Sequence, residues 1–406
     1  MKFKWWAITL IWLAGFYWLA FFSTDIFWGY IPNNDFYDYY VGAKLVSEGK
    51  SPYGITEDWK DMAQNRLKLN FNWATGYSYP PFLAVLIQPL LLLNPYAAAM
   101  VWLGLNIMSY GWFIAKILHR FKTNQKWIAY WAWFSAPVLG SLVVGQVNMW
   151  AMLALFYYIF SNDENKKAVG LAVAIMLKVY PVYFVFLEIW HKNWKLLGKL
   201  AGALILLNLI TLPFNGLKLN YQYVTAVLPA LNNNFDGYFF NQSVNGLVSR
   251  LLTSTDRFRA IVDDSTMKSI NWAVALAGII GLFILTKNMK PGVVKKLYWL
   301  TLILVLAGKN NYINLAPMVI VGAYLIDQWP KLDKISRILV VDGYLLSLLV
   351  FGGSYFWEME LMPISWIQRI GYAVATSTGL GWVVGNLVIL GRLGAGTEAE
   401  RANPAK

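Results

Sequence analysis

Long apolar runs separated by short polar stretches make up most of the chain. A run of about 20 apolar residues predicts a membrane-spanning helix, because that length crosses the hydrocarbon core of a bilayer. The pattern predicts an all-α polytopic membrane protein with about twelve transmembrane helices, in a range of about ten to thirteen. Several runs are shorter than a simple crossing requires, so half-helices or re-entrant pieces stay open as alternatives. The predicted spans are residues 5–28, 80–93, 96–118, 127–142, 146–160, 168–190, 196–213, 270–287, 294–307, 311–327, 336–352 and 365–391.

Composition supports this class of protein and limits the kinds of catalytic and metal sites that the chain can form. Hydrophobic residues make up 58% and charged residues 14% of the chain, against about 45–50% and about 25% in a typical soluble domain. The chain has no Cys and two His, which excludes disulfides and thiolate nucleophiles and argues against a metal site built from His or Cys. We therefore expect no cofactor and no bound metal.

The basic residues indicate how the chain is oriented. Lys2 and Lys4 precede a first run that is too long for a signal-peptide core, so we expect an uncleaved span and a cytoplasmic N-terminus. An even number of spans returns the C-terminus to the cytoplasm, and the basic loops 191–195, 287–296 and 331–337 then obey the positive-inside rule. On this interpretation most of the net charge of +13 reflects the basic residues of cytoplasmic loops. We expect a multi-pass protein of a cell inner membrane with membrane lipids, not nucleic acid, as partners; the oligomeric state stays open.

One loop disagrees with this assignment of loops to the two sides of the membrane. Residues 119–126, with Arg120, Lys122 and Lys126, fall on the outer side. Either the positive-inside rule fails once here, or the short segment 80–93 does not cross the membrane.

Two long loops on the outer side carry the remaining information. Residues 24–78 and 214–269 are expected to form the active-site face of a single transmembrane domain over 1–391. Residues 392–406 are polar and predict a disordered cytoplasmic tail.

The first outer loop predicts two short amphipathic helices on the membrane surface. Tyr37 to Val46 place apolar groups at helical spacing, and Gly49 is a stop signal. A second helix is expected from Thr56, a candidate N-cap, to about Leu69.

An ordered set of motifs over about the first 250 residues resembles glycosyltransferase family 87. The motifs are Asp35-Phe36-Tyr37-Asp38-Tyr39-Tyr40, Gly49-Lys50-Ser51-Pro52-Tyr53, Tyr79-Pro80-Pro81-Phe82, Gly145-Gln146-Val147-Asn148, Lys178-Val179-Tyr180-Pro181 and Asn241-Gln242-Ser243-Val244-Asn245-Gly246 with Arg250. The resemblance implies a GT-C type membrane enzyme that transfers a sugar, mannose in most members, from a polyprenyl-phosphate donor to a lipid or glycan hydroxyl, with inversion. The family often has a Trp and a His where a late span meets the outer surface, whereas this chain has Lys309-Asn310-Asn311-Tyr312.

Such chemistry requires one carboxylate as general base, because the phosphodiester of the donor is already a good leaving group. Asp35 is the candidate, since it follows the first span at the membrane surface and matches the position of the usual catalytic carboxylate in GT-C enzymes. The alternatives are that Asp35 caps the surface helix, or that Asp38 or Asp25 is the base.

Lys178 is the second candidate. It lies inside an apolar run, where a cation is costly and is by default a functional-site candidate. The donor phosphate is the expected partner. The alternatives are a structural ion pair with Glu188 or Asp342, or snorkelling to an interface.

The remaining substrate-binding candidates contribute hydroxyl, amide and cationic groups. They are Asp38, Tyr79, Tyr180, Asn241, Gln242, Arg250 and Lys309. Asn241-Gln242-Ser243 also fits a glycosylation sequon, and Gly145-Gln146-Val147-Asn148 also fits a tight helix connection. A secondary transporter or lipid flippase is the alternative function, but the internal repeat typical of such proteins is not visible.

Overall fold

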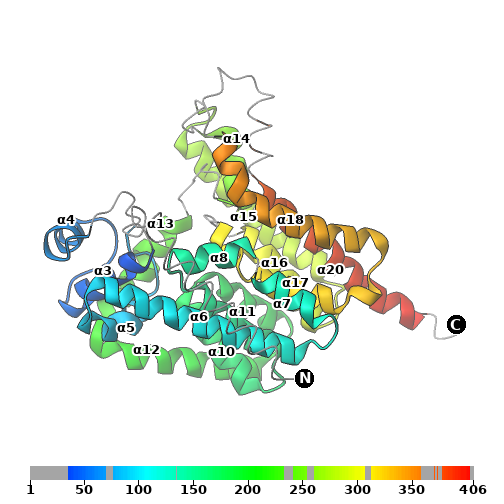
Figure 1. Ribbon diagram of the computed structural model, residues 1–406, viewed down its shortest axis with the longest axis horizontal. Helices are drawn as coiled ribbons and strands as arrows, with labels where there is room; N and C mark the ends of the chain where they lie inside the picture. The colour runs from blue at the N-terminus through cyan, green and yellow to red at the C-terminus, as the bar shows by residue number, and fades with distance from the viewer. Residues whose placement is uncertain are drawn as a thin grey trace.

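The computed structural model describes residues 35–69, 76–133, 135–232, 241–253, 260–306, 312–357, 370, 373 and 377–402. The predicted first span at 5–28 lies outside these residues. The described elements are helical, as the sequence predicts (Figure 1). They are α3 (Asp35–Ser47), α4 (Glu57–Lys60), η2 (Asp61–Arg66), α5 (Pro81–Ile87), η3 (Gln88–Leu92), α6 (Pro95–Arg120), α7 (Gln125–Trp133), α8 (Ala136–Val143), α9 (Asn148–Phe160), α10 (Glu164–Leu177), η4 (Tyr180–Val182), α11 (Tyr183–Trp190), α12 (Trp194–Gln222), η5 (Tyr223–Val227), α13 (Leu228–Asn232), α14 (Val244–Leu252), α15 (Asp264–Thr286), α16 (Val293–Leu306), η6 (Tyr312–Leu315), α17 (Met318–Asp327), η7 (Trp329–Lys331), α18 (Lys334–Trp357) and α20 (Thr378–Ala402).

Three of the described helices are long and apolar enough to cross a membrane. They are α6, the Trp194–Phe214 part of α12, and α15. The other apolar helices are shorter; α9, for example, has 13 residues, which at 1.5 Å per residue spans about 20 Å of a hydrocarbon core about 30 Å thick. The structure thus shows a membrane-type helical bundle, but it does not confirm twelve full spans.

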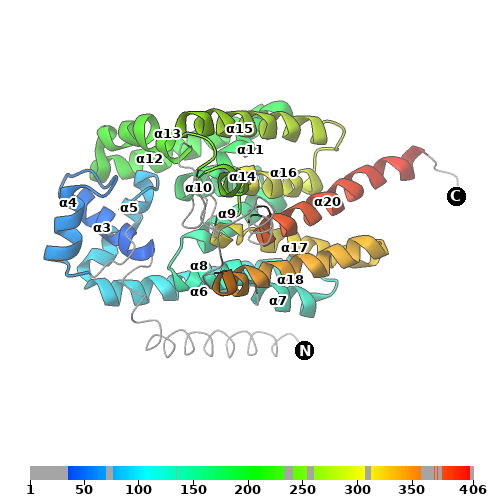
Figure 2. The ribbon, with the colours of Figure 1, turned by 90° about the horizontal axis from the view of Figure 1, so that it is seen from above.

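The short helices fill the middle of the bundle. Viewed from above (Figure 2), α12 and α15 lie along one edge and α6 and α18 along the other, with α9, α10 and α16 between them. Residues of α9, α10 and α16 belong to one large hydrophobic core, whereas α12 and α15 present exposed apolar residues such as Leu206, Leu209 and Leu276. The long helices α12 and α15 therefore expose apolar side chains, as membrane-facing helices do, whereas the short helices form the core.

Several connections meet at one end of the bundle, which we call the basic end. A single cavity is lined by Arg120 at the end of α6, Asn162 before α10, Lys192 after α11 and Pro291 before α16. Loop 119–126 is therefore on the same side as the basic loops 191–195 and 287–296. The three basic loops share one end of the bundle, which is the arrangement that the positive-inside rule requires.

The predicted span at 80–93 is wrong, which explains the disagreement. The rings of Tyr39 and Tyr79 lie 4.8 Å apart, and the hydroxyl of Tyr40 donates to the carbonyl of Leu93 at 2.7 Å. Both ends of the segment therefore contact neighbouring residues of α3, so α5 and η3 stay at the α3 end of the bundle (Figure 1).

The predicted single span at 168–190 is also wrong. Lys167, near the start of α10, and His191, after the end of α11, line the same cavity, so the chain turns back at the break between these helices. Lys178 is extended at this break (φ −143°, ψ 130°), and Pro181 has no backbone N–H with which to continue a helix. The two errors cancel, so the side predicted for the loops after residue 190 is unaffected.

The helices of the first outer loop form where the sequence predicts, but α3 is not a surface helix. Gly49 ends it with a positive φ of 72°, yet almost the whole helix is buried, including the polar Asp38 at 5% exposure. Hydrophobic residues from α5, α6 and α9 surround it.

The C-terminal residues also differ from the prediction. The helix α20 extends to Ala402 and so includes most of the tail 392–406 that was predicted to be disordered.

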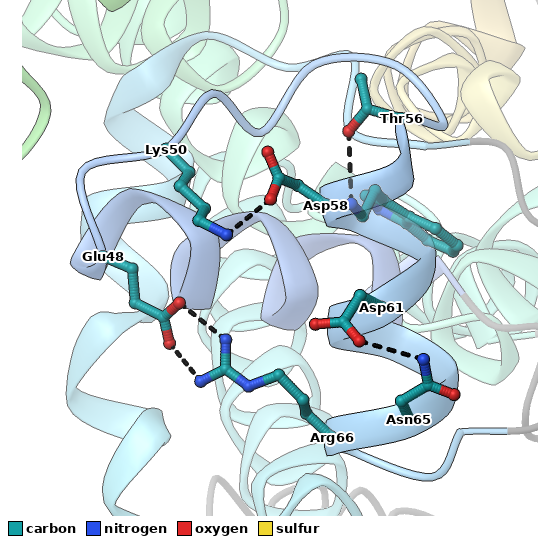
Figure 3. Close-up of polar contacts among 8 residues, drawn as sticks. Glu48, Lys50, Thr56, Asp58, Asp61, Asn65 and Arg66 are labelled. Carbon is teal, nitrogen blue, oxygen red and sulfur yellow. Dashed lines mark hydrogen bonds and ion pairs between the residues drawn. The ribbon is translucent and has the colours of Figure 1, made fainter.

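The second helix of this loop covers α3 through polar contacts (Figure 3). The Thr56 hydroxyl accepts from the backbone N–H of Trp59, which confirms the predicted N-cap. Arg66 contacts Glu48 through two hydrogen bonds of 2.7 and 2.6 Å, and these bonds lower the pKa of the Glu48 carboxyl. The ion pair between Lys50 and Asp58 adds a second link.

The corrected path of the chain predicts the accessibility of single cysteines, which are informative because the natural chain has none. We expect Thr123→Cys and Lys192→Cys to react with a membrane-impermeant maleimide from one side of sealed vesicles. Asn94→Cys should react from the other side, because α6 separates it from Arg120. Labelling of Asn94→Cys and Thr123→Cys from the same side would contradict this path.

Candidate active site

A tight turn between α8 and α9 places Gln146 inside the protein. Gly145 has a positive φ of 73°, and a Cβ atom on it would lie 2.8 Å from the Cβ of Phe36. The indole N–H of Trp102 donates to the carbonyl of Gly145 at 2.7 Å. The turn therefore packs against the start of α3, and a larger residue at Gly145 would separate them.

Gln146 is the centre of a buried hydrogen-bond network. Its Oε1 atom accepts from Lys178 Nζ at 2.9 Å, from the hydroxyl of Tyr79 at 3.0 Å and from the hydroxyl of Tyr39 at 3.1 Å. Burial raises the pKa of Tyr39 and of Tyr79 well above the ordinary tyrosine value. Both hydroxyls therefore stay protonated and can donate at neutral pH.

Lys178 lies at the C-terminal end of α10 and is 9% exposed. Besides Gln146, its ammonium donates to Asn314 Oδ1 at 3.0 Å and to the Tyr79 hydroxyl at 3.3 Å. The same nitrogen lies 4.8 Å from the centroid of the Tyr79 ring. These contacts come from neutral oxygens and a ring face, and among the residues described Lys178 makes no ion pair.

The structural alternatives for Lys178 are not observed. Glu188 instead pairs with Lys296 at 3.3 Å, toward the other end of α11, and Asp342 is exposed on α18. Snorkelling does not fit a nitrogen surrounded by three buried or partly buried side chains. The lysine is therefore held inside the protein at the break in the chain.

The charge of Asp35 acts on this cluster. Asp35 is the first residue of α3, and its carboxylate interacts electrostatically with Lys178, Tyr79 and Tyr39. A helix N-terminus favours the ionised form of a carboxylate. The two candidates that the sequence ranks first are thus brought into one site. Asp38 is more deeply buried and also acts on Tyr79, whereas Asp25 lies outside the described residues.

Tyr180, two residues after Lys178, has a buried hydroxyl group. Its hydroxyl oxygen is buried, and among the described residues it has no hydrogen-bond partner. An unsatisfied buried hydroxyl costs about 1–3 kcal/mol, so this group is free to bind a ligand atom.

Arg250, Asn241 and Gln242 form a second polar cluster. Arg250 is 0% exposed, and its guanidinium donates to the carbonyl of Asn241 at 2.8 Å and to the Ser377 hydroxyl at 2.7 Å. The backbone N–H of Gly379 donates to Gln242 at 2.9 Å. These bonds attach the segment before α14 to the start of α20.

The two clusters are linked through η6. A Cβ atom on Gly379 would lie 2.9 Å from both Gln242 Oε1 and a methyl group of Leu315, and Leu315 follows Asn314 directly. The sequon interpretation of Asn241 does not fit, because this side chain is 0% exposed. Lys309 lies outside the described residues. Within the described part of the chain, no group of three or more His, Asp and Glu side chains is placed to hold a metal ion.

Sequence reasoning missed three members of the network. Tyr39 lies in a motif of the resemblance but had no predicted role. For the motif that contains Gln146, a site role and a tight helix connection both stayed open, and Asn314 lies within the predicted span 311–327. Their importance depends on contacts between segments far apart in the chain. The Gly145-Gln146 pair offered the best clue, because a Gly between two apolar runs marks a turn and Gln146 follows it directly.

The network predicts that Gln146 determines the position of Lys178. Gln146→Leu should leave three buried donors short of one acceptor, at a cost of about 1–3 kcal/mol, and should lower the temperature of thermal unfolding in detergent. Gln64→Leu, at an exposed position of η2, is the control. Equal unfolding temperatures for the two variants would contradict the role of Gln146.

Comparison with known proteins adds the family. No curated protein matches the chain. The profile of glycosyltransferase family 87 matches residues 77–307, more than half of the chain, and this region includes Tyr79, Gln146, Lys178 and Arg250, while Asp35 precedes it. The chain therefore belongs to glycosyltransferase family 87.

Proposed function

We propose that this membrane glycosyltransferase is a GT-C type enzyme that transfers a sugar, mannose in the first instance, from a polyprenyl-phosphate donor to a lipid or glycan hydroxyl. The observation that carries the proposal is the buried cation of Lys178, held by neutral oxygens, with the Asp35 carboxylate within electrostatic range. Lys178 can bind the phosphate of the donor, and Asp35 beside it can accept the proton of the acceptor hydroxyl. Membership of a transferase family argues against the transporter or flippase alternative.

The proposed reaction is a single inverting displacement. The acceptor oxygen forms a bond to the anomeric carbon while the bond from that carbon to the phosphate oxygen breaks. The acceptor proton passes to Asp35, and the bonding electron pair leaves on polyprenyl phosphate. Negative charge grows on the leaving oxygen, and Lys178, oriented by Gln146 and Asn314, stabilises it electrostatically.

Asp35 suits the role of base better than Asp38 does. Asp35 is half-buried at the helix terminus, whereas Asp38 is 5% exposed within α3. We propose Tyr79, Tyr180 and Asp38 as further substrate-binding groups. For Arg250, Asn241 and Gln242 the observed contacts support an indirect role, in which they fix η6 and with it Asn314.

The basic end of the bundle supports an orientation. The positive-inside rule assigns this end to the cytoplasm, so the α3 end and the site would face the non-cytoplasmic side of an inner membrane. The ion pair between Arg392 and Asp333 at 3.2 Å brings the late part of α20 to the basic loop before α18. A cytoplasmic C-terminus, and with it a cytoplasmic N-terminus, agrees with this arrangement.

The base assignment predicts a large effect of one substitution. Asp35→Asn should insert and fold normally but lose on the order of 10²–10⁴ in transfer rate, the usual contribution of a general base. The rate is measured as release of polyprenyl phosphate from polyprenyl-phosphate mannose. Asp58→Asn, in the exposed part of the same loop, should keep its activity. Near-normal turnover of Asp35→Asn would remove Asp35 from the mechanism.

The phosphate assignment predicts the effect of removing the cation. Lys178→Met keeps the apolar length of the side chain and should lower turnover by about tenfold or more, because charge stabilisation in the transition state is lost. Its unfolding temperature should stay close to that of the wild type, since Gln146 keeps two tyrosine donors. Lys60→Met is the control on the exposed loop. A destabilised Lys178→Met protein with full turnover per folded molecule would show a structural lysine instead.

We propose that the reaction needs no metal ion, because the buried ammonium of Lys178 is placed to supply the charge stabilisation that Mg²⁺ or Mn²⁺ held by carboxylates would otherwise provide. Transfer should therefore persist in EDTA at an unchanged rate. Complete loss in EDTA with recovery in Mn²⁺ would make Asp35 and Asp38 metal ligands.

A further inference from the structure

The cavity at the basic end is separate from the candidate active site. It has a volume of about 520 Å³ and is formed where α6, α9, α10 and α11 end or begin, together with the connection from α15 to α16. Four cationic side chains and one carboxylate line it: Arg120, Lys167, Lys192, Lys296 and Glu188. A volume in this range is typical of sites for small molecules and cofactors.

The one carboxylate is already neutralised at the floor of the cavity. Glu188 is 2% exposed and accepts from the hydroxyl of Tyr158 at 2.6 Å and from Asn193 Nδ2 at 2.9 Å. Lys296 pairs with it at 3.3 Å and lies 4.0 Å from the centroid of the Tyr158 ring. This floor is polar, and its single negative charge has a partner.

The three cations nearer the rim are not neutralised. Among the residues that the structure describes, Arg120, Lys167 and Lys192 make no ion pair, although Lys195 and Lys199 close by both contact Glu164. The cavity lining therefore has an excess of positive charge. Charged loops that only satisfy the positive-inside rule would not need to enclose a cavity with a buried ion pair as its floor.

His191 supplies a second, independent indication of a ligand. It lines the cavity, and its Nε2 atom is buried without a hydrogen-bond partner among the described residues. A buried polar atom without a partner is costly. A rotation of the imidazole toward the cavity would let a ligand oxygen satisfy it.

We propose that this cavity binds a phosphate-bearing anion, and that an anionic phospholipid headgroup from the adjacent leaflet is its source. Exposed apolar side chains lie close in the chain to the lining residues Glu188, His191 and Asn193, namely Phe186 at 50%, Ile189 at 43% and Trp194 at 65% exposure. Such a surface can hold acyl chains beside the headgroup. Free phosphate shares the recognised group and is the alternative source. The site is distant from Asp35 and Lys178, so it does not depend on the proposed reaction.

The test compares lipid and phosphate binding between matched variants of the full chain in detergent. Native mass spectrometry measures retention of short-chain phosphatidylglycerol or phosphatidylcholine, and calorimetry measures inorganic phosphate. The rim variant is Arg120→Gln with Lys167→Gln and Lys192→Gln, and the control is Lys195→Gln with Lys199→Gln. The single variant Lys192→Glu repeats the test with a smaller perturbation.

We expect the wild type and the control to retain phosphatidylglycerol over phosphatidylcholine. The rim variant should bind it more weakly by roughly fivefold for each cation removed. Phosphate binding that is lost in the rim variant without any lipid preference would identify the soluble anion as the source and still support an anion site. If phosphatidylglycerol and phosphate bind the rim variant, Lys192→Glu and the wild type equally well, the proposal is wrong.

Discussion

One constraint accounts for the arrangement around the candidate site, namely that a lysine cation lies inside an apolar bundle. A buried charge is tolerated only when hydrogen-bond partners replace its water. For Lys178 these partners come from the α8–α9 turn, from the segment before α5 and from η6. Each of these segments meets the lysine between helices, where α8, α9 and α10 begin or end inside the protein.

The same constraint organises α3. The start of this helix packs on the turn that holds Gln146, and Tyr39 donates to that side chain. The helix is buried because hydrophobic residues of α5, α6 and α9 pack around it in one core. The outer helix that begins after Thr56 then covers it through the Glu48–Arg66 pair. Asp35 is consequently placed by packing, not by a flexible loop.

The sequence predicts well the features that depend on local residue properties, and predicts poorly where the chain turns back within the bundle. Apolar runs, the cap at Thr56 and the stop at Gly49 depend on local properties, so they were predictable. Hydropathy cannot distinguish one long span from a hairpin of two half-helices, which is why 168–190 was misassigned. Asp35 and Lys178 could be identified because charged residues are conspicuous beside or within apolar runs. Gln146 and Asn314 could not, because their roles depend on contacts between distant segments.

The central claim is that Asp35 and Lys178 act in one site, and a double-mutant cycle tests it most directly. Transfer rates are measured for the wild type, Asp35→Asn, Lys178→Met and the double variant. Residues that act together show coupling energies of about 0.5–3 kcal/mol, whereas independent ones are additive within about 0.5 kcal/mol. The account predicts that the double variant loses less activity than the product of the two single losses. Strictly multiplicative losses would place the two residues in separate roles and contradict it.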